Sequence, residues 1–200
     1  MIIKTIPAGR LQTNCYVVVD ENSNEAIVID PGQDPDLIIR GIEELNCRVI
    51  SILLTHAHAD HDDGVVDVKN KYNVPVYMHR EEEKYMNLGN YEYYGKLPKI
   101  YKFIEDGDIL KVGDKDIKCI YTPGHTRGGI CFLIEGKLFT GDTLFKGAIG
   151  RSDLIGGNFN ELIESITEKL LVLDENIEVY PGHGPKSTII FEKMTNPFLT

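Results

Sequence analysis

The chain has 200 residues, with 21 Lys and Arg against 31 Asp and Glu, so its formal net charge is −10. This length predicts one domain, residues 1–200, that can bury a substantial core. The negative charge argues against nucleic acid and an anionic membrane surface as partners, because both are bound through basic side chains; a small-molecule substrate is the expected partner, and the oligomeric state stays open.

The hydrophobic pattern predicts strands and helices along the chain. Strands are expected at residues 2–6, 15–20, 26–30, 49–54, 76–78, 109–112, 117–121, 130–134, 137–140 and 178–180. Helices are expected at residues 36–45, 62–72, 81–86 and 159–173. The strands fall into two groups, each accompanied by helices, which favours two sheets packed face to face with helices outside.

The cellular location is inferred from what the sequence lacks. No apolar stretch approaches the ~20 residues of a membrane-spanning helix, and the N-terminus is too short and too mixed for a signal peptide. The cysteines form no C-x-x-C pair and lie in or beside apolar runs, at Cys15, Cys47, Cys119 and Cys131. We therefore expect reduced, mostly buried thiols and a cytoplasmic protein, and we expect no thiolate among its metal ligands.

Residues 56–61, His-Ala-His-Ala-Asp-His, place three imidazoles and a carboxylate directly after the apolar run 49–54. Neutral imidazole is the commonest side-chain ligand of divalent zinc, iron and nickel. Histidines at i and i+2 of an extended segment point to the same side of it, and the next bend brings Asp60 and His61 to the same cavity. This spacing predicts a metal site.

Similar groups follow other predicted strands. His125 and His183 each come after a Pro-Gly pair that ends an apolar run, and Asp142 follows the strand at 137–140. Asp30 begins a third such turn, Asp-Pro-Gly. The residue before proline is held extended and Pro-Gly turns the chain, so we expect these strand ends to meet at one rim. His79 lies away from these motifs and is interpreted as structural.

These motifs resemble the metallo-β-lactamase superfamily, in the order 55–61, 122–125, 141–143 and 181–183. The resemblance covers residues 30–183, and residues 141–153 are most similar to small glyoxalase II-like hydrolases that consist of the catalytic domain alone. It implies an α/β fold, a four-layer αββα sandwich of two mixed β-sheets with helices on the outer faces. It also implies two divalent metal ions per chain, zinc first, with iron or manganese as alternatives.

The resemblance also assigns roles to residues. The metal ligands would be His56, His58 and His125 at one site, Asp60, His61 and His183 at the other, and Asp142 as the bridge. The implied enzyme is a binuclear metallohydrolase in which a metal-bridging hydroxide cleaves a small acyl thioester, such as a hydroxyacyl-glutathione, or a related ester. Asp60 and Asp142 are the expected catalytic carboxylates, because they offset much of the metals' positive charge.

The sequence differs from several branches of this superfamily, and these differences reduce the number of activities to be expected. True β-lactamases lack the bridging aspartate at position 142 and are exported, which argues against their reaction, and flavodiiron reductases carry Glu in place of His58. Long glyoxalase II enzymes bind glutathione through a C-terminal helical domain that does not follow here, so glutathione recognition stays open. The alternative is a mononuclear-iron persulfide dioxygenase, with a Gly-Arg-(Ser/Thr)-Asp segment like residues 150–153 and iron held by His56, His125 and Asp142. A non-catalytic metal-binding module is a third reading.

Two residues near the motifs have two interpretations each. Arg151 matches a basic substrate-binding position and could hold a substrate carboxylate, or it could pair with Asp153. Asp30 could fix the tautomer of a ligand imidazole, or it could cap the bend at residues 31–32.

Two segments receive weaker predictions. Residues 88–98, with tyrosines at 91, 93 and 94, suit a loop over the pocket or exposed packing. Residues 81–83, Glu-Glu-Glu, are interpreted as a solvated helix start favoured by the helix dipole.

Overall fold

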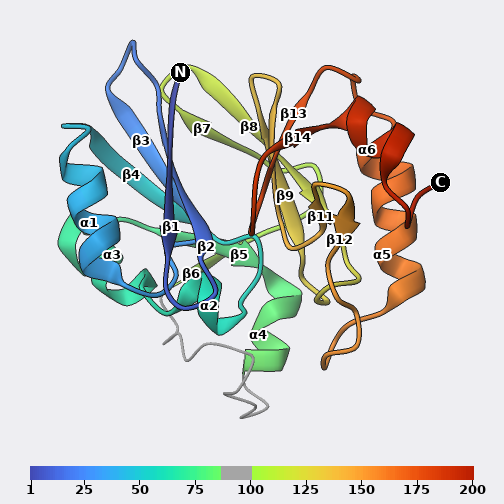
Figure 1. The fold of residues 1–200 in the computed structure, drawn as a ribbon. Coiled ribbons are helices and arrows are strands. Elements are labelled where there is room, and N and C mark those ends of the chain that lie inside the picture. The colour runs from blue at the N-terminus through green and yellow to red at the C-terminus, as the bar shows by residue number, and fades with distance from the viewer. Residues whose placement is uncertain (87–100) are drawn as a thin grey trace.

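The computed structural model describes residues 1–86 and 101–200, and it contains two six-stranded sheets and one two-stranded sheet. The two large sheets lie between outer helices (Figure 1). One buried cluster joins them, with Ile27 and Leu53 from the first sheet against Phe132 and Phe139 from the second. Two further clusters fill the spaces between each sheet and its helices. The predicted αββα sandwich of two mixed sheets is therefore confirmed.

The first sheet brings two functional strand ends to one edge. Its order is β1 (Ile2–Ala8), β2 (Thr13–Val19), β3 (Glu25–Ile29), β4 (Arg48–Leu53), β5 (Val76–His79) and β6 (Tyr101–Ile104). The first three strands are antiparallel, and β3 to β6 are parallel. Because parallel strands end at the same edge, Asp30 after β3 and His56 after β4 are neighbours.

The second sheet does the same for the C-terminal motifs. Its order is β14 (Ser187–Thr188), β13 (Glu178–Pro181), β10 (Lys137–Gly141), β9 (Ile130–Ile134), β8 (Lys115–Tyr121) and β7 (Ile109–Val112). Strand β10 runs parallel to β13, with Gly141 opposite Pro181. Asp142 and His183 therefore leave the sheet side by side. A small hairpin follows, of β11 (Leu144–Phe145) and β12 (Ala148–Ile149).

The helices are α1 (Pro35–Glu43), α2 (Ala59–Asp62), α3 (Val65–Tyr72), α4 (Arg80–Met86), α5 (Phe159–Ser165), the π-helix η1 (Ile166–Leu170) and α6 (Ile189–Thr195). In the described residues the helices cover the outer faces of the sheets, except for α2 and α4, which lie at one edge of the sandwich (Figure 1). Ile38 of α1 and Val68 of α3 pack on the first sheet, and Leu162 of α5 and Ile189 of α6 pack on the second. No helix in the described part of the chain is both long and apolar enough to cross a bilayer.

Two predicted helices differ from the observed ones. The helix predicted at 62–72 is split into α2 and α3 at Gly64, where an added Cβ would lie 2.3 Å from the carbonyl oxygen of Gly32. This close packing against the 31–32 bend interrupts the helix. The helix predicted at 159–173 changes to a π-helical turn after Ser165 and ends at Leu170. Five elements were not expected from the sequence: the strands β6, β11, β12 and β14, and the helix α6.

Candidate metal centre

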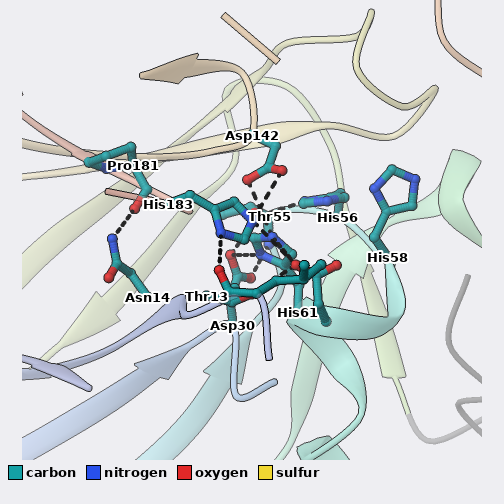
Figure 2. Close-up of polar contacts among 12 residues, drawn as sticks. Thr13, Asn14, Asp30, Thr55, His56, His58, His61, Asp142, Pro181 and His183 are labelled. Carbon is teal, nitrogen blue, oxygen red and sulfur yellow. Dashed lines mark hydrogen bonds and ion pairs between the residues drawn. The ribbon is translucent and has the colours of Figure 1, made fainter. Parts of the chain in front are cut away.

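The residues predicted as metal ligands meet at the edge where strand ends of both sheets converge (Figure 2). Their ligand atoms form three overlapping groups in which all atoms lie within 4.8 Å of one another. The groups are His56, His58 and His125; His56, His61 and Asp142; and Asp60, His61 and His183. The structure thus brings all the predicted ligand residues together, from both sheets and from the short helix α2.

Asp142 lies at the middle of this cluster. Its Oδ1 atom is 3.3 Å from Nε2 of His61, and its Oδ2 atom is 3.7 Å from Nε2 of His125 and 3.5 Å from Nε2 of His183. Its two oxygens therefore face histidines of both expected metal sites. The backbone of Gly182 packs against the Asp142 carboxylate, because a Cβ on Gly182 would lie 2.2 Å from Oδ1 of Asp142. Glycine before His183 is thus a steric requirement of the site.

Most of the imidazoles are oriented through their Nδ1 atoms. His125 Nδ1 lies 2.7 Å from the carbonyl oxygen of Arg151, and His183 Nδ1 lies 3.2 Å from that of Leu11. His61 Nδ1 lies 3.0 Å from a carboxylate oxygen of Asp30. In the neutral ring, a hydrogen bond donated by Nδ1 leaves Nε2 unprotonated and able to bind a metal. In these rings Nε2 faces the centre, as a metal ligand must.

Several atoms of the centre have unused bonding capacity. The Nε2 atom of His56 is buried and makes no hydrogen bond to the described residues. The buried Nε2 of His61 and Oδ1 of Asp142 face each other at 3.3 Å as an ion pair, and neither makes a hydrogen bond within the described part of the chain. Buried polar atoms normally have a partner, because an unsatisfied one costs free energy. Divalent cations between these atoms would satisfy them. A donor set of imidazole nitrogens and carboxylate oxygens, without thiolate, fits zinc, iron or manganese.

The centre has two halves, one formed by His56, His58 and His125 and the other by Asp60, His61 and His183. The two halves differ in the protonation of their histidines. Burial lowers the pKa of His56 and His125 and brings that of His58 to about 3, so these rings are neutral at pH 7. For His183, burial acts in the same direction but is outweighed by the carboxylates of Asp142 and Asp60, which raise its pKa to about 9. His61 is likewise raised, by Asp142 and Asp30 against the effect of burial. Neutral ligands therefore form one half, and histidine–aspartate ion pairs form the other.

Asp30 contacts a ligand residue, as one of its two interpretations requires. Besides His61, it accepts hydrogen bonds from the backbone N–H and the hydroxyl of Thr55, at 2.7 and 2.6 Å. Its backbone lies in the left-handed region, with φ of 49°. The carboxylate is thus held by the residue before His56 while it faces His61.

A cavity of about 540 Å³ opens over the centre. It is lined by His58, Asp60, His125, Asp142 and His183 together with Leu11, Gln33, Ala59, Arg151 and Leu154. The Arg151 guanidinium also makes two hydrogen bonds of 2.8 Å to Asp153, so both of its predicted positions, at the pocket and beside Asp153, are observed. The predicted tyrosine loop at 88–98 falls within residues 87–100, outside the described residues.

Thr13 contacts the candidate ligand Asp60, and the sequence did not predict this contact. It lies at the start of β2, and its hydroxyl donates to Oδ2 of Asp60 at 2.7 Å (Figure 2). Nothing in the local sequence marks Thr13, because its contact depends on the pairing of the first strands. His79, by contrast, stacks on Tyr121 with ring centroids 4.2 Å apart, consistent with a structural role.

Glu82 was predicted to be solvated, and that prediction is wrong. Its side chain is fully buried, and its carboxylate accepts the backbone N–H groups of Ala57, at 2.8 Å, and Gly128, at 2.6 Å. The surrounding Glu81 and Glu83 are only partly buried. Met86 is also buried, four residues further along α4, so the helical period from Glu82 marks the inward face.

Known proteins resemble the chain over its whole length. The model of the metallo-beta-lactamase superfamily matches residues 8–183. The hydroxyacylglutathione hydrolase GloC of Haemophilus influenzae is 39% identical over 209 residues, which cover 100% of this chain and 98% of that protein.

Solved structures agree with this match. The BLEG-1 B3 metallo-beta-lactamase superposes with a TM-score of 0.90 at 36% identity and covers 100% of both chains. ETHE1 from Myxococcus xanthus superposes with a TM-score of 0.84 at 28% identity, over 98% of this chain and 84% of the other. With the ligand cluster and the two-sheet sandwich described above, these matches establish that the chain belongs to the metallo-beta-lactamase superfamily.

Proposed function

We propose that this protein is a binuclear metallohydrolase that cleaves small acyl thioesters or related esters. The position of Asp142 carries the proposal, because its two oxygens face His61 at 3.3 Å and His125 at 3.7 Å, one histidine from each ligand group. A carboxylate in this place suits two metals held close together. The similarity to a hydroxyacylglutathione hydrolase supports the choice of a thioester.

The chemistry divides between the metals and the protein. When bound, two divalent cations lower the pKa of water toward ~7 and polarise a substrate carbonyl. Asp60 faces the cavity, and its carboxylate is held by the hydroxyl of Thr13 and by Nε2 of His183, 3.2 Å away. Against the effect of burial, these contacts lower the pKa of Asp60, so it is ionised at neutral pH. An ionised Asp60 can orient water at the reacting carbonyl.

The cavity provides for the substrate without a protein nucleophile. All the cysteines lie in the described part of the chain, and none lines the cavity. Arg151 offers a cation for a carboxylate or an oxyanion, while Leu11 and Leu154 offer apolar surface. A short acyl group joined to a thiol has both polar and apolar parts and suits this lining.

A persulfide dioxygenase is the second candidate. The structural similarity to ETHE1 supports it, and His56, His125 and Asp142 meet at the same centre. β-Lactam hydrolysis was disfavoured by the sequence, yet a B3 metallo-beta-lactamase superposes over the whole chain. A β-lactam therefore belongs among the tested substrates.

Metal analysis of untreated protein, combined with activity assays, tests the proposal. The assays should measure thioester hydrolysis, persulfide-dependent oxygen uptake and hydrolysis of a chromogenic β-lactam. We expect two metals per chain and thioester hydrolysis. One iron per chain with oxygen uptake would establish the dioxygenase instead, and turnover of the β-lactam alone would replace the thioester as substrate class.

A further inference from the structure

Glu82 joins the two loops that carry the three-histidine group. One carboxylate oxygen accepts the N–H of Ala57, which lies between His56 and His58, at 2.8 Å. The other accepts the N–H of Gly128, three residues after His125, at 2.6 Å. The first loop follows β4 of one sheet and the second follows β8 of the other. Glu82 thus links the two sheets directly beside the metal centre.

The contact leaves almost no freedom between the two loops. A Cβ on Gly128 would lie 2.6 Å from Cγ and 2.7 Å from Oε1 of Glu82, so only glycine permits this approach. The same two loops also meet through their histidine rings, because Nδ1 of His58 lies 3.0 Å from Nε2 of His125. The separation of these ring nitrogens therefore depends on how closely Glu82 holds the loops together.

Two backbone N–H groups on different loops require a side chain with two acceptor oxygens, which Glu82 provides. A carboxylate only accepts hydrogen bonds, and here each oxygen receives one backbone N–H. Glutamine has nearly the same shape but only one acceptor oxygen, and its NH₂ group would face the other N–H. Burial of an ionisable group is costly without such partners. Full burial on α4, whose other glutamates are partly exposed, is explained by this pair of hydrogen bonds.

We propose that Glu82 is a positioning residue of the metal centre. Its carboxylate sets the distance between the loop of His56 and His58 and the loop of His125, and thereby the metal affinity of this group. The group of Asp60, His61 and His183 does not include the loop of Gly128 and depends much less on Glu82. The inference rests on the metal centre and not on the proposed substrate, so a wrong substrate leaves it intact.

Metal titration against a chelating dye tests the proposal on single sites. In a His183→Ala background, which weakens the other group, Glu82→Gln should lower zinc affinity by roughly 10–100-fold, the usual effect of removing a group that orients metal ligands. In a His58→Ala background the same change should have little effect. Glu81→Gln is the matched control, because Glu81 pairs with Lys84 at the surface. Cobalt-loaded protein should show altered visible absorption bands for Glu82→Gln and unaltered bands for Glu81→Gln.

A purely structural role predicts a different result. Glu82→Gln would then lower the melting temperature of the metal-free protein and weaken both sites equally, or neither, and this outcome overturns the proposal. Gly128→Ala provides a second variant if Glu82→Gln does not fold, because its Cβ displaces the same carboxylate from the other loop. It should reproduce the selective loss at the three-histidine group, and unchanged affinity there would equally reject the inference.

Discussion

Nδ1 of His61 lies 3.0 Å from Oδ2 of Asp30, and neither side chain is more than 2% exposed. Asp30 is itself fixed by two hydrogen bonds from Thr55, so the ring of His61 is held from a rigid point. Its Nε2 atom is thereby directed at Asp142, 3.3 Å away. The orientation of this ring, rather than the mere presence of histidine, prepares the second half of the centre for metal.

Asp30→Asn should therefore weaken the second metal site. The asparagine oxygen can still accept from Thr55, but its NH₂ group would face Nδ1 of His61 and favour the tautomer that is protonated at Nε2. We expect a loss of metal affinity of about 10–100-fold, measured by chelator competition. Asp36→Asn, at an exposed position of α1, is the control. Equal affinities of the two variants would mean that Asp30 only caps its turn.

Asp142→Ala should remove a ligand from both halves of the centre at once. Loss of a residue that only hydrogen-bonds to a metal ligand typically costs about 10–100-fold. We expect turnover of Asp142→Ala to fall by more than this, and its metal content to lie below that of the wild type. The fold should be retained, because Asp142 follows β10 at the sheet edge and the core residues of that strand are unchanged. Circular dichroism and metal analysis check both points. A variant with two metals and wild-type turnover contradicts the bridging role.

Metal binding should release protons mainly from one half of the centre. At pH 7 the metal-free protein holds a proton on His183, whose pKa is raised to about 9 by Asp142 and Asp60 against the effect of burial. Affinity at the group of His183 should thus rise with pH up to about 9, whereas His58, with a pKa of about 3, has no proton to lose. Calorimetry in buffers of different ionisation enthalpy measures the release.

The same pKa shift affects the stability of the metal-free protein. The raised pKa of His183 adds to the free energy of unfolding. This stabilisation is fully present below the ordinary histidine pKa of 6.5 and is lost as the pH rises through about 9. His183→Ala should remove this dependence and reduce the proton release on metal binding. Binding without proton release at pH 7 would show that His183 is neutral in the metal-free protein.

Arg151→Ala should raise KM more than it lowers kcat for an anionic acyl thioester. The Arg151 side chain lines the cavity but belongs to none of the groups of candidate metal ligands, so its loss removes uniform binding of the substrate. We expect roughly a tenfold rise in KM, the effect of one charge-assisted hydrogen bond of about 1.5 kcal/mol. Asp153→Asn should lower KM, because it frees the guanidinium from its pair of hydrogen bonds.

The control for this prediction is a distant arginine. Arg48→Ala removes an ion pair with Glu25 at the beginning of β4, away from the cavity, and should leave KM unchanged. Steady-state kinetics on an anionic and a neutral thioester separate the outcomes. If Arg151→Ala changes KM equally for the anionic and the neutral thioester, the guanidinium does not bind the negative charge of the substrate.

Local patterns in the sequence were sufficient for the sandwich and for the convergence of the cluster. Alternating and continuous apolar runs indicate strands, and Asp30, Thr122 and Tyr180 each stand before a Pro-Gly turn at a strand end. Histidine and aspartate after these turns have the chemistry of metal ligands wherever they meet. Strand, turn and ligand signals all reside within a few neighbouring residues, which is why a single sequence reveals them.

Contacts between distant segments were decided by the tertiary structure alone. Glu82 is indistinguishable in composition from Glu81 and Glu83, yet α4 places only its carboxylate between Ala57 and Gly128. Thr13 reaches Asp60 because the first strands pair at that edge, and Gly64 interrupts a helix because the backbone of Gly32 packs against it. The sequence by itself determined which groups could bind metal. Packing of two sheets determined which nitrogen of each ring faces the centre, because tautomer and loop spacing depend on hydrogen bonds between segments far apart in the chain.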